Sequence, residues 1–144
     1  MLATLTYRLA VRAGVPLASL LLRKPAVRRG HRGRLEAVDR LETWAGQPRD
    51  PARPLVWFHA SSVGESLQAR AVLTELRRLR PELQAVATRF SASAERLAPT
   101  MPADCVEYVP YDRPADVRRV LQALQPSLLV FAKLDVWPEL ATQA

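Results

Sequence analysis

Hydrophobic and polar positions follow a helical rhythm in the first third of this 144-residue chain and a different rhythm after it. Residues 1–22 are rich in Leu, Ala and Val and predict an apolar helix. Apolar residues then recur at steps of three from Leu35 to Trp44, which predicts a second helix over 35–45. Residues 47–54 are rich in proline and predict a loop, the best candidate for a linker between a membrane-proximal part and a folded domain.

Beyond this loop, short apolar runs alternate with helical patterns. The predicted strands are 55–58, 83–88, 105–109 and 127–131, and the predicted helices between them are 66–79, 91–97 and 115–124. This alternation is typical of β-α-β units and predicts an α/β fold, a Rossmann-like parallel sheet flanked by helices with right-handed crossovers. The last strand holds consecutive apolar residues, which predicts that both its faces are buried. A final helix near 138–144 stops abruptly, and we expect the chain to be a fragment.

The apolar start predicts an anchor that lies on a membrane. Arg8 and Arg12 interrupt it one helical turn apart. A spanning helix needs about 20 apolar residues with few charges, so the two arginines favour a helix in the interface. A buried N-terminal helix is the alternative.

The formal charge of +7 matters mainly through its placement. Six basic residues follow the apolar start, namely Arg23, Lys24, Arg28, Arg29, Arg32 and Arg34. Such a cluster beside an apolar helix indicates attraction to an anionic membrane surface, and a solvated basic face or a linker is the alternative. Nucleic acid is disfavoured as a partner because no interleaved aromatic residues offer a stacking platform. We therefore expect a membrane-proximal helix and basic segment over 1–34 and a Rossmann-like domain over 35–144.

Several site classes are excluded by composition. Cys105 is the one cysteine, so neither a disulfide framework nor a cysteine metal site exists, which suits a reducing compartment. Two histidines, His31 and His59, are too few for a multi-histidine metal centre. The usual glycine-rich dinucleotide and triphosphate fingerprints are absent.

Chemistry is expected where the predicted strands end. Ligands of open parallel sheets bind outside the carboxyl ends of the strands. The loops 59–65, 89–93, 110–113 and 133–137 occupy such places and should cluster on one rim.

The first of these loops reads His-Ala-Ser-Ser-Val-Gly-Glu over residues 59–65. His59, Ser61 and Ser62 offer polar groups, Gly64 permits close approach of a ligand, and the next helix N-terminus favours a phosphate, a carboxylate or a sugar acid. Glu65 is the one carboxylate of the loop and a candidate general base. The alternative is that Glu65 only complements the helix dipole.

The other loops supply further candidates. Arg89 is a candidate phosphate clamp, although a surface arginine is an equal interpretation. Lys133 and Asp135 are placed to bind a phosphate or to pair with each other. Trp137 precedes a proline that holds it extended, and packing is favoured for it over stacking on a ligand ring.

Three motifs resemble those of 3-deoxy-D-manno-octulosonate (Kdo) transferases. Residues 57–65, Trp-Phe-His-Ala-Ser-Ser-Val-Gly-Glu, resemble the family signature W-x-H-A-x-S-x-G-E. Residues 109–114, Val-Pro-Tyr-Asp-Arg-Pro, resemble its P-Y-D-x-P turn, and residues 135–140, Asp-Val-Trp-Pro-Glu-Leu, resemble E-L-W-P-N-L. The three occur in the family's order over roughly residues 35–144.

This resemblance implies the N-terminal, acceptor-side half of a two-domain GT-B glycosyltransferase. The implied reaction moves Kdo from CMP-Kdo to a lipid A precursor in lipopolysaccharide biosynthesis, with no metal or cofactor. Glu65 would be the catalytic base, and His59, Ser61, Ser62, Gly64, Arg89, Lys133 and Asp135 would bind the acceptor. CMP-Kdo would occupy a C-terminal domain that is absent here, so the fragment alone should be inactive. The implied location is the cytoplasmic face of the bacterial inner membrane. A catalytically inactive docking module is the alternative.

The chain departs from the family pattern at three places. Lys133 stands where the family usually has an acidic residue, and Asp135 stands where it has glutamate. The threonine-rich segment after the second predicted strand carries fewer threonines here, over residues 87–93.

Overall fold

The structure is a computed structural model that describes residues 2–133 and 135–144. Its helices are α1 (Leu2–Leu21), α2 (Pro25–Gly46), α3 (Val63–Leu79), the 3₁₀ helix η1 (Ala92–Thr100), α4 (Pro114–Leu124) and α5 (Pro138–Gln143). Its strands are β1 (Leu55–His59), β2 (Gln84–Arg89), β3 (Cys105–Tyr108) and β4 (Leu128–Phe131).

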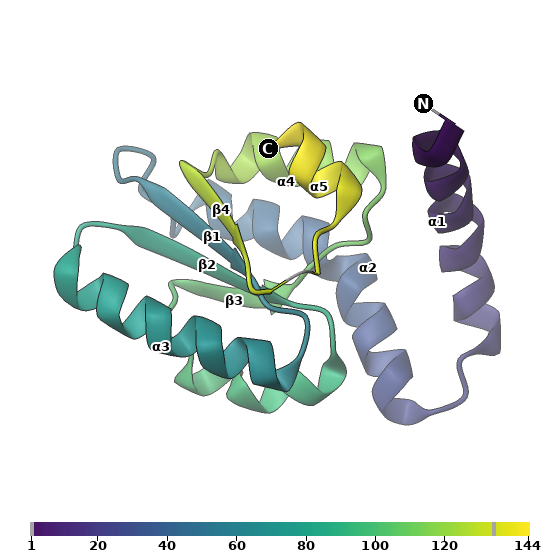
Figure 1. Cartoon of the computed structure of the whole chain (residues 1–144), viewed down its shortest axis with the longest axis horizontal. Coiled ribbons are helices and arrows are strands. Elements are labelled where there is room, and N and C mark those ends of the chain that lie inside the picture. Colours follow the sequence, from purple (N-terminus) through teal and green to yellow (C-terminus); the bar gives the residue numbers. More distant parts are fainter. Residues whose placement is uncertain (1, 134) are drawn as a thin grey trace.

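The four strands form one parallel sheet in the order β3-β2-β1-β4 (Figure 1). All strands point the same way because each is followed by a helix that returns the chain to the other end of the sheet. The predicted α/β class and the parallel sheet flanked by helices are therefore confirmed.

Alternate residues of the strands fill two cores. Leu55 and Trp57 of β1 face a core shared with α2, α4 and α5, whereas Val56 and Phe58 face a core shared with α3 and with Met101, which follows η1. All five residues of β1 are buried, as its unbroken apolar run predicts. The sheet is thus a buried layer between two helical layers.

The prediction that β4 is buried on both faces was wrong. The strand order places β4 at the edge of the sheet. Leu128 is 54% exposed, and the three residues after it are only partly buried. A consecutive apolar run indicates a strand, but it does not distinguish a central strand from an edge strand.

Helix α2 is longer than predicted and includes most of the basic segment. It begins at Pro25, because proline is pre-organised for the first turn of a helix, so the expected boundary at residue 34 lies inside it. Arg28, Arg29 and Arg32 are exposed, but Arg34 is buried. Gly33 lets Tyr108 lie against the helix, since a Cβ atom at Gly33 would be 2.3 Å from the ring.

Helix α1 stands beside α2 at the side of the domain (Figure 1). Its inner face carries Tyr7, Val11 and Val15, at the spacing of one helix face. Its outer face is apolar, with exposed leucines at Leu5, Leu9, Leu17, Leu20 and Leu21. No helix among the described residues is long and apolar enough to cross a membrane.

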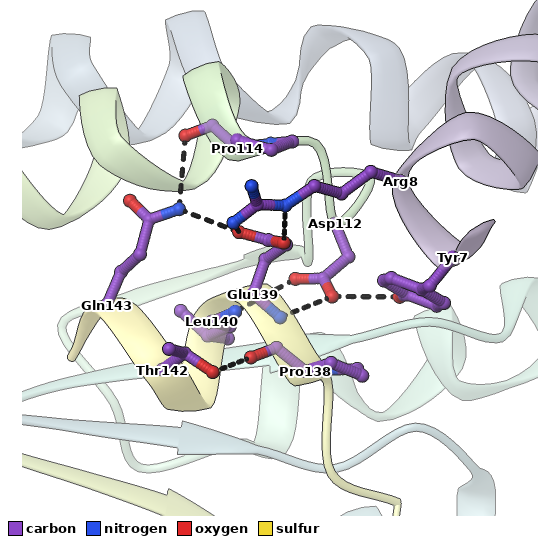
Figure 2. A network of polar contacts seen from close by, with 9 residues as sticks. All are labelled: Tyr7, Arg8, Asp112, Pro114, Pro138, Glu139, Leu140, Thr142 and Gln143. Carbon is purple, nitrogen blue, oxygen red and sulfur yellow. Dashed lines mark hydrogen bonds and ion pairs between the residues drawn. The ribbon is translucent and has the colours of Figure 1, made fainter. Parts of the chain in front are cut away.

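Polar contacts fasten α1 to the far end of the chain (Figure 2). The Tyr7 hydroxyl donates to Asp112 Oδ2 at 2.8 Å, and the Arg8 guanidinium pairs with the Glu139 carboxylate. Asp112 also accepts from the backbone N–H groups of Glu139 and Leu140 at 2.8 and 3.0 Å, so it caps α5. Arg8, one of the two arginines that interrupt the apolar start, is therefore turned toward the domain.

Candidate functional site

The four predicted loops lie together at the carboxyl ends of the strands. Backbone hydrogen bonds connect the segments that follow neighbouring strands. Ser91 N donates to Ser61 O at 2.8 Å, and Ala132 N donates to His59 O at 2.8 Å. Val109 N donates to Arg89 O at 2.8 Å, which connects the loop after β3 to the end of β2. The parallel sheet thus produces the predicted rim.

His59 is the buried centre of this rim, with 1% of its surface exposed. The indole N–H of Trp137 donates to His59 Nε2 at 2.9 Å. Because an indole nitrogen can only donate, Nε2 carries a lone pair, and Nδ1 holds the proton and donates to Thr88 Oγ1 at 3.0 Å. Ser61 Oγ lies 2.8 Å from the same Nε2. His59 is therefore a neutral imidazole that joins β1, β2 and the Trp137 loop.

Burial lowers the pKa of His59 from 6.5 to about 4. The unfolded chain takes up a proton below pH 6.5, whereas the folded chain resists it until about pH 4, so His59 contributes stability above pH 6.5 that is lost as the pH falls toward 4. We expect this group alone to lower the free energy of unfolding by about 3 kcal/mol over that range. Urea denaturation at successive pH values measures the loss.

The matched variant is His59→Gln, whose unfolding free energy should change much less between pH 6.5 and pH 4.5. The pKa of His31 is lowered in the same direction, by burial and by the charge of Arg34, so a smaller slope should remain. An unchanged slope in His59→Gln would show that this histidine is not buried in its neutral form.

Helix α3 begins at Val63, three residues before the predicted start at Ser66, so Glu65 lies in its first turn. Ser62 is the N-cap. Its hydroxyl accepts from Glu65 N at 3.3 Å, while Glu65 Oε2 accepts from Ser62 N at 3.1 Å, which completes a capping box. The helix-capping role offered as the alternative is therefore present. Among the residues that the structure describes, none donates to Glu65 Oε1 or forms an ion pair with Glu65, whose side chain is half-buried.

Gly64 has no need of a glycine's conformational freedom. Its φ is not positive, and a Cβ atom there would meet nothing within 4 Å. The space next to Gly64, beside Glu65 at the N-terminus of α3, is therefore open. Close approach of a ligand to this turn stays a prediction.

Arg89 is the last residue of β2 and is 8% exposed. Its guanidinium carbon lies 4.2 Å from the centre of the Tyr108 ring. Its Nε and Nη1 atoms are buried without a hydrogen-bond partner. It is not the surface arginine of the alternative interpretation, and the phosphate-clamp role stays a prediction.

The fourth loop brings one of its predicted residues against the site. Trp137 packs on Phe90 with ring centres 5.2 Å apart and lies edge-on to His59 at 5.9 Å. Lys133 and Asp135 are both exposed, and no ion pair joins them in the part of the chain that is described. Lys133 has a φ of 65°, an uncommon conformation for a residue other than glycine. Residue 134 lies outside the described residues.

Sequence reasoning missed the contributions that helix α2 makes to the rim. The two nitrogens of His31 contact the Ser19 and Tyr111 hydroxyls. The Arg34 guanidinium carbon lies 4.0 Å from the Phe90 ring centre and 5.1 Å from that of Tyr111. The available signal was spacing, since His31 and Arg34 lie three residues apart and continue the apolar face of residues 35–44.

The rim combines a half-buried carboxylate, serine hydroxyls and buried cations without carboxylate partners. Such a set can bind a polar, anionic molecule and remove a proton from one of its hydroxyl groups at Glu65. Within residues 2–133 and 135–144, no group of three or more His, Cys, Asp or Glu side chains is arranged to hold a metal ion.

Comparison with known proteins identifies the family. The sequence model of the family described as 3-deoxy-D-manno-octulosonic-acid transferase (kdotransferase) matches residues 32–144. A 3-deoxy-D-manno-octulosonic acid transferase of Rickettsia felis is 33% identical over 89 residues, which cover 60% of this chain and 19% of the relative. One of Haemophilus influenzae is 32% identical over 91 residues, covering 61% and 21%.

A probable mitochondrial 3-deoxy-D-manno-octulosonic acid transferase of Arabidopsis thaliana is 29% identical over 118 residues, which cover 77% of this chain and 26% of the relative. The chain thus spans about a fifth to a quarter of the length of these curated relatives. The family match covers more than half of the chain and includes all three motifs that predicted it. This chain belongs to the 3-deoxy-D-manno-octulosonic acid (Kdo) transferase family.

Proposed function

We propose that this chain is the acceptor-binding half of a GT-B glycosyltransferase that moves Kdo from CMP-Kdo to a lipid A precursor. One observation carries the proposal. Glu65, the carboxylate of the family signature, lies at the sheet rim with one oxygen held by Ser62 N and the other free of partners among the described residues. Held in this way, the carboxylate keeps a fixed direction and can still accept a proton.

In the proposed reaction, Glu65 takes the proton of an acceptor sugar hydroxyl. The hydroxyl oxygen then forms a bond to the anomeric carbon of Kdo, and the bond from that carbon to CMP breaks. CMP leaves with the bonding electrons. A donor-binding half must supply the CMP-Kdo site, so we expect no turnover by this chain alone.

A chimera tests the proposal. Residues 32–144 would replace the matching segment of the Haemophilus influenzae relative, and transfer from CMP-Kdo to a lipid A precursor would be measured by mass spectrometry. We expect transfer by the chimera and none by the chain alone. A chimera that is folded and binds CMP-Kdo but transfers nothing would contradict the proposal, with the unaltered relative as the positive control.

The outer surface of α1 and α2 supports attachment to the cytoplasmic face of an anionic inner membrane. The exposed leucines of α1 form an apolar face, and Arg23, Lys24, Arg28, Arg29 and Arg32 are exposed next to it. Apolar burial and basic charges at about 1 kcal/mol each add in such an attachment.

The same surface would serve the second candidate function, an inactive docking module. Glu65 distinguishes the two, because a docking module binds phosphatidylglycerol vesicles through the basic residues and is indifferent to Glu65 in every assay. Dependence of transfer on Glu65 therefore favours the enzyme.

A further inference from the structure

A groove of about 290 Å³ runs between the first half of α2 and the segment 90–93. Gly30 and Arg34 line it from α2, and Phe90, Ser91 and Ser93 line it from the segment that begins η1. Gly30 keeps the two elements close, since a Cβ atom there would lie 3.1 Å from Arg34 Nη1 and 3.3 Å from Ala92 Cβ. The remaining lining residues, Ala26, Val27 and Ala92, are apolar, so the polar groups of the groove are those of Arg34, Ser91 and Ser93.

Arg34 is a buried cation without a counter-ion. Only 7% of its surface is exposed, and it forms no ion pair with any described carboxylate. Nη1 donates to Phe90 O at 2.7 Å, and Nε is buried without a partner. Phe90 and Tyr111 hold the guanidinium by its faces, which leaves its edge for hydrogen bonds.

Arg89 adds a second uncompensated charge, one residue before Phe90. It is 92% buried by the same measure, and its Nε and Nη1 atoms lack partners. Burying a charge costs several kcal/mol unless an opposite charge offsets it. Only Arg34 of the two lines the groove, so it is the charge that an anion bound there would offset.

The start of η1 provides matching donors. Ser91 caps this nine-residue helix, and its hydroxyl lies 2.7 Å from that of Ser93. The end of a helix that exposes N–H groups also attracts anions. Both hydroxyls are able to turn toward a ligand, because each can donate or accept.

We propose that this groove binds a phosphate group, with Arg34 as its main ligand and the Ser91 and Ser93 hydroxyls as secondary ones. A phosphate offers more oxygens than a carboxylate and can accept from the guanidinium edge and the hydroxyls together. Ser91 N bonds to Ser61 O, so the groove adjoins the Glu65 turn. This assignment rests on the proposed function, in which the phosphate group is part of the acceptor sugar.

Titration of the ¹⁵N-labelled full chain tests the site. Inorganic phosphate should shift the backbone amide signals of residues 90–93, and Arg34→Gln should weaken binding at least tenfold. Arg28→Gln removes the same charge from the exposed side of the same helix and should leave the affinity unchanged. Equal losses in the two variants, or shifts spread over residues 23–32, would overturn the proposal.

Two further arms keep the result interpretable. Ser91→Ala combined with Ser93→Ala removes both hydroxyls and the Ser91 cap of η1, and urea denaturation checks that the variant is folded. It should weaken phosphate binding about threefold even if Arg34→Gln unfolds, and an unchanged affinity in the folded variant contradicts the site. A soluble glucosamine phosphate should bind at least tenfold more tightly than inorganic phosphate. Equal affinities would overturn the assignment to the acceptor and not the Glu65 chemistry, which the chimera tests separately.

Discussion

Replacing Glu65 with glutamine in the chimera should lower the transfer rate by about 10²- to 10⁴-fold, the range that general base catalysis supplies. The change removes one proton-accepting oxygen and little else. Glutamine also completes capping boxes, because its carbonyl oxygen can accept from Ser62 N as the carboxylate does. The measurement is the rate at saturating acceptor and donor, together with urea denaturation of the variant.

Glu75→Gln is the matched control for this experiment. Glu75 lies in the same helix, is exposed, and pairs with Arg78. We expect its replacement to leave transfer within twofold of the parent. If Glu65→Gln retains full activity while its stability is unchanged, the carboxylate is a helix cap and the base lies elsewhere.

Replacing Asp112 with alanine should lower the free energy of unfolding by about 3–5 kcal/mol, because three donors lose a charged acceptor. Asp112 is 2% exposed and receives the Tyr7 hydroxyl and the N–H groups of Glu139 and Leu140 (Figure 2). Its loss would release α1 from one side and the first turn of α5 from the other. Urea denaturation followed by tryptophan fluorescence measures the effect.

Asp39→Ala removes the same charge at a surface position. Asp39 contacts Arg119 with 77% of its side chain exposed, so its replacement should cost little. Similar losses in the two variants would mean that the buried network contributes no more than a surface ion pair. We also expect Asp112→Ala to slow transfer in the chimera, because α5 sets the position of Trp137 against His59.

The strands and the rim were predictable because both follow from short apolar runs. Each predicted strand lies within one residue of the observed one, and a parallel sheet places all strand ends on one side. The edge position of β4 was not predictable, since strand order depends on the packing of the whole sheet and not on the residues of one strand.

The polar contacts of the N-terminal helices were not predicted, although the spacing of His31 and Arg34 places both on the apolar face of α2. Arg34 looks like one more member of a basic cluster, yet it is buried because the helical pattern from Leu35 to Trp44 extends backward and turns it inward. Arg8 looks like an interruption of an apolar helix, and its partner Glu139 lies 131 positions away. Pairs at such separations are determined by the tertiary fold.

The capping box of Glu65 lies between these two cases. Ser62 and Glu65 have the spacing of a capping box, so the local structure could have been read from the sequence. The free carboxylate oxygen beside the open space at Gly64 required coordinates.

Binding of the acceptor at the sheet rim, next to Glu65, is tested most directly by titrating this chain with a soluble phosphorylated glucosamine disaccharide and following the amide shifts. We expect the largest shifts in residues 59–66 and 89–93. Shifts confined to α1 and the exposed face of α2, with the rim signals unmoved, would contradict binding at the rim.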